Sequence, residues 1–134
     1  MSQENTTVVK GIYEALGRAE MQTVFDLFHP ECEIHVPSRL PWGGRYEGHE
    51  GLDAFIGKLT RTVEGEAKIE RYIDDEEGHV VAIGHARGRI LATEREYKAP
   101  EAIVWTVESG KVVRLEAYVD VLPVREALGT RAPV

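Results

Sequence analysis

Residues 41–59, PWGGRYEGHEGLDAFIGKL, decide most about the fold of this 134-residue chain. Gly43 and Gly44 follow Trp42 directly, and glycine penalises both helix and strand, so this part of the stretch predicts a loop. After Gly48 the apolar residues recur at helical spacing, which predicts a helix of about three turns. Its apolar side consists of Leu52, Phe55, Ile56 and Leu59. An aromatic loop that leads into a packed helix indicates the rim and wall of a small-molecule pocket.

The residues before this stretch predict two helices and a strand. Thr6 or Thr7 is expected to cap a first helix that runs to Arg18. The apolar spacing in residues 21–28 predicts a second, short helix, which stops before Pro30. Residues 31–36, ECEIHV, are typical of a strand that ends at Pro37.

The residues after position 66 are rich in strand formers. Four segments alternate or are β-rich between turn sequences: AKIERYID (67–74), HVVAIGHARGRIL (79–91), EYKAPEAIVWTV (96–107) and KVVRLEAYVDV (111–121). Three helices followed by such strands predict an α+β fold with the helices on one face of a curved antiparallel sheet. We expect a single domain over residues 1–134, because no linker or repeat interrupts the chain.

The composition excludes several classes of partner and site. A net charge of −7 argues against binding to nucleic acid or to anionic membranes. Cys32 is the single cysteine, which fits a reducing compartment, and no signal-peptide or membrane-spanning run is present, so we expect a cytoplasmic protein. Cys32 and His35 would face opposite sides of a strand, and no other metal-binding spacing occurs. We therefore expect neither a metal nor a cofactor.

Three motifs in this order, PWGGRYEGHEGL, YKAPEAIVWTVESGKVV and EAYVD, resemble the SnoaL-like family. This family belongs to the superfamily of nuclear transport factor 2 and ketosteroid isomerase, and the likeness extends from about Thr6 to Gly129. It implies a cone-shaped sheet wrapped around a long N-terminal helix, with two further helices and a ligand in the open end of the cone. Such folds host isomerases, cyclases, epoxide hydrolases, dehydratases and binding proteins, so the fold alone does not identify a reaction.

The positions at which these enzymes carry their catalytic groups hold apolar residues in this chain. The resemblance places the isomerase tyrosine at Ile12, although Tyr13 is adjacent and the register can slip by one residue. Apolar side chains cannot accept a proton, so none of the known mechanisms transfers. The other positions that correspond to catalytic groups in the isomerases, cyclases and epoxide hydrolases are Val36, Ile103, Gly84, Ala86 and Ala117.

Strand alternation gathers small and apolar side chains on one face of the predicted sheet. If this face is directed into the cone, it forms a roomy apolar cavity that suits a small, largely apolar organic ligand. The residues expected to bind this ligand are Ile12, Val36, Trp42, Tyr46, Phe55, Leu59, Gly84, Ala86, Ile103, Trp105, Leu115, Ala117 and Val119.

Glu101 is the one carboxylate predicted on the inward face. Burial beside Trp105 would raise its pKa and make it a usable acid or base, whereas a position at the strand start would leave it in solvent. Tyr13 is the second candidate catalytic residue. Trp42 either closes over a ligand or packs on the core of the protein.

Three other polar residues have weaker assignments. Tyr46 and His49 are candidates for polar contacts with the ligand, although His49 can equally face water at the entry to the helix. By strand alternation Asp120 lies on the outer face of the sheet. A structural role at the strand end is therefore favoured for it over catalysis.

The opposite face mixes apolar and charged side chains, including Val81, Ile83, Val104 and Tyr118, which predicts a homodimer through the outer face of the sheet. For function we expect a binding protein for a small apolar molecule. The alternative is a cofactor-free isomerase, a polyketide-cyclase-like enzyme or a lyase or hydrolase that uses Glu101 or Tyr13. A protein-interaction adaptor, which would have an occluded cavity, is the third hypothesis.

Overall fold

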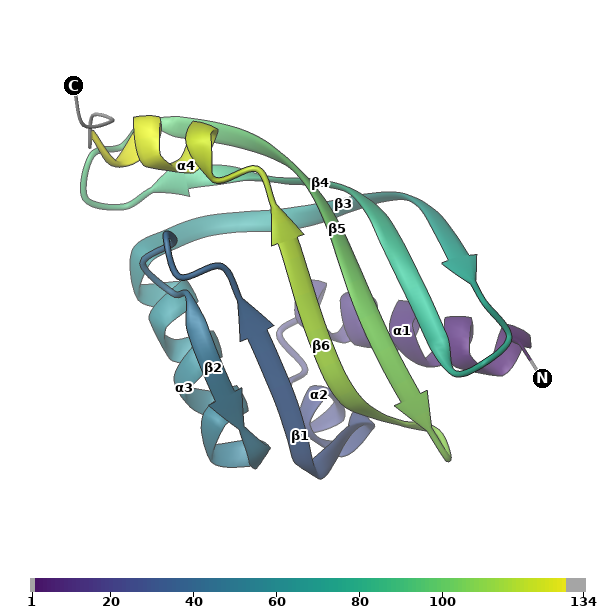
Figure 1. Ribbon diagram of the computed structural model, residues 1–134. Coiled ribbons are helices and arrows are strands. Elements are labelled where there is room, and N and C mark those ends of the chain that lie inside the picture. Colours follow the sequence, from purple (N-terminus) through teal and green to yellow (C-terminus); the bar gives the residue numbers. More distant parts are fainter. Residues whose placement is uncertain (1, 130–134) are drawn as a thin grey trace.

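In the computed structural model, which describes residues 2–129, a six-stranded curved sheet packs against helices (Figure 1). The elements follow in the order α1 (Ser2–Gly17), α2 (Met21–Leu27), β1 (Phe28–Val36), β2 (Gly44–Glu47), α3 (Gly48–Thr62), β3 (Val63–Asp74), β4 (His79–Ile90), β5 (Glu96–Glu108), β6 (Lys111–Val119) and α4 (Val121–Leu128). The predicted α+β fold class is therefore confirmed.

The strands lie in the order β2-β1-β6-β5-β4-β3, and the sheet is not closed. All neighbours are antiparallel except β1 and β6, which run parallel. The expectation of a wholly antiparallel sheet was wrong at this pair. The hairpin from β5 fixes the direction of β6, and β1 joins the free edge of β6 after a long connection, which allows a parallel pairing.

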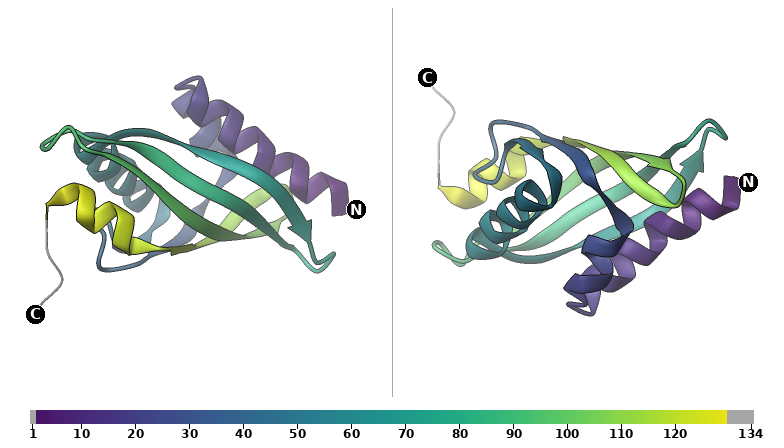
Figure 2. Two further views of the ribbon diagram at one scale, coloured as in Figure 1. Left: turned by 90° about the horizontal axis from the view of Figure 1, so that it is seen from above. Right: turned by 90° about the horizontal axis from the view of Figure 1, so that it is seen from below.

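Helices α1, α2 and α3 lie on one side of the curved sheet, whereas α4 lies at the end of the β4–β5 hairpin (Figure 2). Val9 and Ile12 of α1 are fully buried between this helix and the strands. In β4 the even-numbered residues from Val80 to Gly84 are buried, and in β5 Tyr97, Ala99 and Trp105 are buried. The predicted inward and outward parities of the two strands are therefore correct. None of the helices within residues 2–129 is long and apolar enough to cross a membrane.

Two boundaries in the N-terminal part differ from the predictions. Helix α1 begins at Ser2, so neither Thr6 nor Thr7 caps it; the Thr7 hydroxyl instead donates to the Gln3 carbonyl oxygen within the helix, at 2.7 Å. Strand β1 begins at Phe28 rather than at residue 31. Pro30 lies where the β1–β6 register shifts, and such irregular positions tolerate a residue without an N–H donor.

The glycines of the 41–59 stretch surround a strand that the sequence did not predict. Residues Gly44–Glu47 form β2 and pair with β1, so the prediction of a loop was wrong for this part. A Cβ atom on Gly43 would lie 1.9 Å from the Pro37 carbonyl oxygen, and Gly48 has a φ of 67°, which favours glycine. These glycines permit the tight turns on either side of β2.

Helix α4 is a fourth helix beyond the three that were predicted. The Asp120 carboxylate caps it by accepting a hydrogen bond from the Leu122 backbone N–H at 3.2 Å, and Gly129 ends it in the left-handed conformation. The structural role favoured for Asp120 is therefore confirmed. Pro123 lies in the first turn of the helix, where its missing N–H costs nothing, and this proline was a sequence signal that could have identified the helix.

Candidate functional site

The inner face of the sheet has a sealed part and a part that keeps contact with solvent. Some of the residues predicted to bind a ligand are buried in the hydrophobic core: Ile12, Val36, Trp42, Tyr46, Gly84, Trp105 and Leu115. Others are only half-buried against that core: Phe55, Leu59, Ala86, Ile103, Ala117 and Val119. The half-buried set lies on β4, β5, β6 and α3.

Glu101 lies on the inner face of β5, between Gly84 of β4 and Val119 of β6. Its side chain is half-buried, and within residues 2–129 it makes no hydrogen bond and no ion pair. Its flanking residues offer neither a polar group nor a charge, and burial therefore raises the pKa of the Glu101 carboxyl to about 7. The carboxyl group can exchange a proton at neutral pH.

Tyr13 and Trp105 form an edge-to-face aromatic pair beside Glu101, with ring centroids 5.4 Å apart. The Tyr13 hydroxyl and the Trp105 indole Nε1 are both buried, and neither has a hydrogen-bond partner in the described part of the chain. Burial raises the pKa of Tyr13 far above its ordinary value, and the Glu101 charge raises it further. The neighbouring indole N–H favours the ionised form of Tyr13 and partly opposes this rise in the pKa, although the pair does not meet the geometry of a hydrogen bond.

The two neighbouring candidates on α1 lie in different surroundings. Ile12 is fully buried in the core. Tyr13 is half-buried, and the charge of Glu101 raises the pKa of its hydroxyl. Tyr97, four residues before Glu101 on the same face of β5, was missed by the sequence reasoning. Burial raises the pKa of Tyr97, and the Glu101 charge adds to this effect. The parity of β5 was the signal that could have identified it.

The polar groups of the β2 region already have partners within the protein. The Tyr46 hydroxyl donates to the Trp42 carbonyl oxygen at 2.8 Å, and His49 Nε2 lies 2.8 Å from the Phe28 carbonyl oxygen. The interpretation of His49 as a residue facing water is therefore wrong, because this contact joins α3 to β1. The Trp42 side chain is only 8% exposed and packs in the core, which is one of the two arrangements predicted for it.

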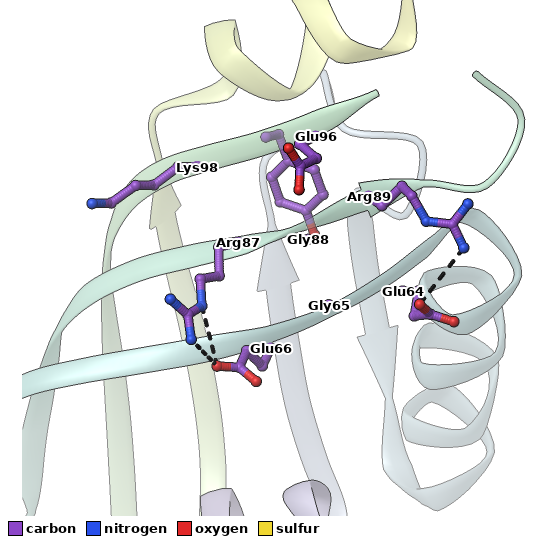
Figure 3. Close-up of a pocket in the computed structure, with 9 residues that line it drawn as sticks. Glu64, Gly65, Glu66, Arg87, Gly88, Arg89, Glu96 and Lys98 are labelled. Atoms are coloured by element: carbon purple, nitrogen blue, oxygen red, sulfur yellow. Dashed lines mark hydrogen bonds and ion pairs between the residues drawn. The ribbon is translucent and has the colours of Figure 1, made fainter. Parts of the chain in front are cut away.

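Two hollows lie elsewhere on the protein, and neither is lined by Glu101 or Trp105. The first, of about 820 Å³, lies over the ends of β3, β4 and β5. Figure 3 shows Arg87 directed toward Glu66 and Arg89 toward Glu64, with Gly65 and Gly88 between these two charge pairs. The closest contact, from Arg87 Nη2 to Glu66 Oε1, is 2.8 Å. The charged cross-strand pairs make this hollow unsuited to an apolar ligand.

The second hollow, of about 420 Å³, lies at the end of β1 and includes Val36 and Ala117 together with charged residues. Arg114 Nη2 donates to His35 Nδ1 at 3.3 Å, and the Tyr118 hydroxyl donates to the Glu116 carboxylate at 3.1 Å. The sequence reasoning did not identify this polar network. Within residues 2–129 no three His, Cys, Asp or Glu side chains are grouped closely enough to hold a metal ion.

The curved, open sheet with a long helix across it has the nuclear transport factor 2-like fold. Within this class the chain belongs to the SnoaL-like domain family, whose model matches residues 9–115. The resemblance inferred from the three motifs is confirmed.

Relatives and solved structures agree with this assignment. An uncharacterized protein from Mycobacterium bovis is 25% identical in an alignment of 116 residues that covers 84% of this chain and 87% of the relative. A nuclear transport factor 2-like protein from Burkholderia xenovorans is 26% identical, with a TM-score of 0.86 over 95% of this chain and 97% of its own. A putative SnoaL-like polyketide cyclase from Shewanella denitrificans is 15% identical, with a TM-score of 0.78 over 95% and 98% of the two chains, and this likeness concerns the fold alone.

Proposed function

We propose that this protein is a cytoplasmic binding protein for a small, largely apolar organic molecule, which it holds on the inner face of the sheet. The single observation that carries the proposal is the position of the two unpartnered polar atoms, Tyr13 Oη and Trp105 Nε1, next to inward-facing residues that are only half-buried. A buried polar group without a hydrogen bond costs about 1–3 kcal/mol, and a bound molecule can remove this cost.

The half-buried apolar residues supply the other part of the argument. Ile103, Ala117 and Val119 face the concave side beside Glu101 but are not sealed by the helices. Each apolar side chain that a ligand covers contributes through the area removed from water, at about 25 cal/mol per Å². An apolar molecule therefore gains more at this position than at the two charged hollows.

The proposal predicts that the neutral apolar fluorophore N-phenyl-1-naphthylamine binds the protein and becomes more fluorescent. For a probe of this size, we expect a dissociation constant of about 1–100 μM. The variant Ile103→Trp places a larger ring between Glu101 and Trp105, and it should weaken binding at least about tenfold. Fluorescence titration of the purified full chain measures both values.

Thr106→Trp is the matched control, because Thr106 lies on the same strand and faces outward. This variant should bind the fluorophore as the original protein does. Equal binding by Ile103→Trp and the original protein would place the ligand away from the inner face. No binding by the original protein would contradict the proposal and favour the adaptor hypothesis.

The second candidate function is a cofactor-free isomerase, cyclase or lyase, and the pKa of Glu101 supports it. A carboxyl group with a pKa of about 7 can both accept and return a proton under neutral conditions. Against this candidate, Glu101 and Tyr13 make no hydrogen bond with each other in the described residues. Incubation of a bound ketone in heavy water discriminates the two, since only an acid–base enzyme accelerates deuterium exchange next to the carbonyl group.

We also propose that two copies associate through an apolar outer patch formed by Ile73, Val81, Ile83, Ala102, Val104 and Tyr118. The six residues lie in two adjacent cross-strand rows, and Ile73 and Tyr118 are 41% and 58% exposed. Charged side chains flank the patch, as is typical of an interface with a polar rim.

Val104→Glu at the centre of this patch should raise the dissociation constant of the dimer more than about tenfold. Sedimentation velocity measures this as a shift from twice the chain mass toward 15.0 kDa. Leu91→Glu is the control, because Leu91 is an exposed apolar residue, 39% accessible, outside the patch. A monomeric original protein would show that the patch has no such role.

A further inference from the structure

The hollow at the end of β1 lies beside the outer face of the sheet, on the side opposite to Glu101. Strand β1 ends at Val36, and Pro37 begins a turn, whereas β6 continues to Val119 (Figure 1). The last part of β6 therefore has no neighbour on the β1 side. The space there, of about 420 Å³, is large enough for a small organic molecule.

Contacts within the protein fix the position of Arg114 in the wall of this hollow. Its Nη2 donates to His35 Nδ1 at 3.3 Å, and since an arginine can only donate, His35 is neutral and carries its proton on Nε2. Arg114 Nε is buried and lies 3.2 Å from one oxygen of the Glu116 carboxylate. The Tyr118 hydroxyl donates to the other oxygen of that carboxylate at 3.1 Å. The guanidinium is therefore held in place before a ligand arrives, which lowers the cost of binding.

Arg45 supplies the second positive charge of the hollow. It lies opposite His35 on β2, so both side chains are on the outer face of the sheet. Arg45 is exposed, and within residues 2–129 it forms neither a hydrogen bond nor an ion pair. Its N–H donors are therefore available to a ligand in the hollow.

The charges around the hollow favour a ligand that carries one negative charge. Its lining contains two arginines and one glutamate, Glu116, so one positive charge is not compensated there. Glu33 and Glu47 lie outside the hollow, in the same cross-strand row as Arg114. These three carboxylates make a second negative charge on the ligand unfavourable. A carboxylate carries one charge, and its planar shape matches the donor geometry of a guanidinium group.

The remaining lining residues suit an apolar group next to this charge. Pro37 and Ala117 are half-buried, and Val36 lies buried between them and the core. A ring or short chain that covers Pro37 and Ala117 removes apolar area from water while the carboxylate stays beside the arginines. The hollow therefore combines a charged wall with an apolar wall.

From these observations we propose that the hollow at the end of β1 binds a small organic monocarboxylate. Its carboxylate accepts hydrogen bonds from Arg45 and Arg114, and its apolar part covers Pro37 and Ala117. This site is separate from the inner face and does not depend on the proposed function. Tyr118 belongs both to the hollow and to the outer patch, so the site lies at the edge of the surface proposed for association.

Three ligands with one aromatic ring test the charge of the group that binds: benzoate, benzamide and phenyl phosphate. Each is titrated into the ¹⁵N-labelled full chain at about pH 7.5, where benzoate is ionised. Benzoate should shift the amide signals of His35, Arg45 and Ala117, with a dissociation constant of about 0.1–3 mM. Benzamide has nearly the same shape without the charge, and it should bind at least about tenfold more weakly. Phenyl phosphate should also bind more weakly than benzoate.

The variants Arg45→Gln and Arg114→Gln each remove one positive charge from the hollow. Either variant should raise the dissociation constant of benzoate at least about tenfold, as the loss of a hydrogen bond to a charged group implies. Arg18→Gln is the matched control, because it makes the same charge change at an exposed residue outside the hollow. It should change the dissociation constant less than about twofold in about 0.15 M salt. If Arg114→Gln does not fold, Arg45→Gln at an exposed side chain provides the test.

The proposal is overturned if benzoate shifts no signal of the hollow, or if benzamide binds as tightly as benzoate. Equal binding of benzoate by Arg45→Gln and the original protein would also overturn it. Tighter binding of phenyl phosphate would contradict the preference for a single charge and hence the assignment to a carboxylate. Binding of the neutral fluorophore on the inner face should be the same in Arg45→Gln and the original protein, so this proposal and the proposed function can fail independently.

Discussion

Replacement of Trp105 by alanine is expected to lower the free energy of unfolding by about 3–5 kcal/mol. Trp105 is among the largest fully buried side chains, and its ring contacts both Tyr13 and Phe28, with centroids 5.4 Å and 6.0 Å away. Alanine removes these contacts and leaves a cavity between α1 and β5, which the rigid strand cannot close. Urea unfolding followed by circular dichroism measures the change.

Trp105→Phe is the control that separates packing from hydrogen bonding. Phenylalanine keeps most of the ring volume and removes the unpartnered N–H, so its cost should be well below that of alanine. A loss under about 1 kcal/mol for Trp105→Ala would mean that the ring does not hold α1 against the sheet. The arrangement of Tyr13 beside Glu101 would then be unsupported.

The substitution Glu101→Gln is expected to stabilise the protein above neutral pH. The pKa of Glu101 rises from 4.5 to about 7 on folding, and each pKa unit corresponds to about 1.4 kcal/mol. The unfolded chain therefore ionises at a lower pH than the folded chain, and stability falls as the pH rises from about 4.5 to about 7. Glutamine does not titrate, so the variant should avoid a loss of about 3 kcal/mol at about pH 8.

The measurement is the free energy of unfolding of both proteins between about pH 5 and pH 8. Glu96→Gln is the control, since Glu96 is an exposed glutamate on the same strand. The difference between Glu101→Gln and the original protein should grow with pH, whereas the control difference should stay constant. Parallel pH profiles for all three proteins would show that Glu101 titrates as an ordinary glutamate and that the site lacks a proton-exchanging group.

The sequence predicted the fold class and the inner face well because periodicity reports burial directly. The alternation in β4 and β5 placed Ala82, Gly84 and Trp105 inward, as the structure has them. It also placed Glu101 on that face, and the absence of a polar partner beside Gly84 and Val119 explains its raised pKa. The alternation of side chains along each strand was sufficient for these assignments, since each assignment depends on one strand and its nearest neighbours.

The features that the sequence did not reveal depend on contacts between distant segments. The parallel pairing of β1 with β6 and the contact of Tyr13 with Trp105 join residues about 80–90 positions apart, and no local pattern encodes such pairs. Strand β2 was missed because glycine penalises a strand in isolation, whereas here Gly44 is only its first residue. Which of Ile12 and Tyr13 lies near Glu101 likewise depends on how α1 packs on the sheet, and a local pattern does not show this.

The most direct test of the proposed ligand site on the inner face of the sheet is a nuclear magnetic resonance titration of the ¹⁵N-labelled protein with N-phenyl-1-naphthylamine. The chain has two tryptophans and hence two indole N–H signals, and Trp42→Phe identifies the one from Trp105. Binding on the inner face predicts that the Trp105 indole signal shifts most, together with the amides of Ile103 and Val119. An unchanged Trp105 signal, with shifts confined to residues of the charged hollows such as Arg87 or Arg114, would contradict the account.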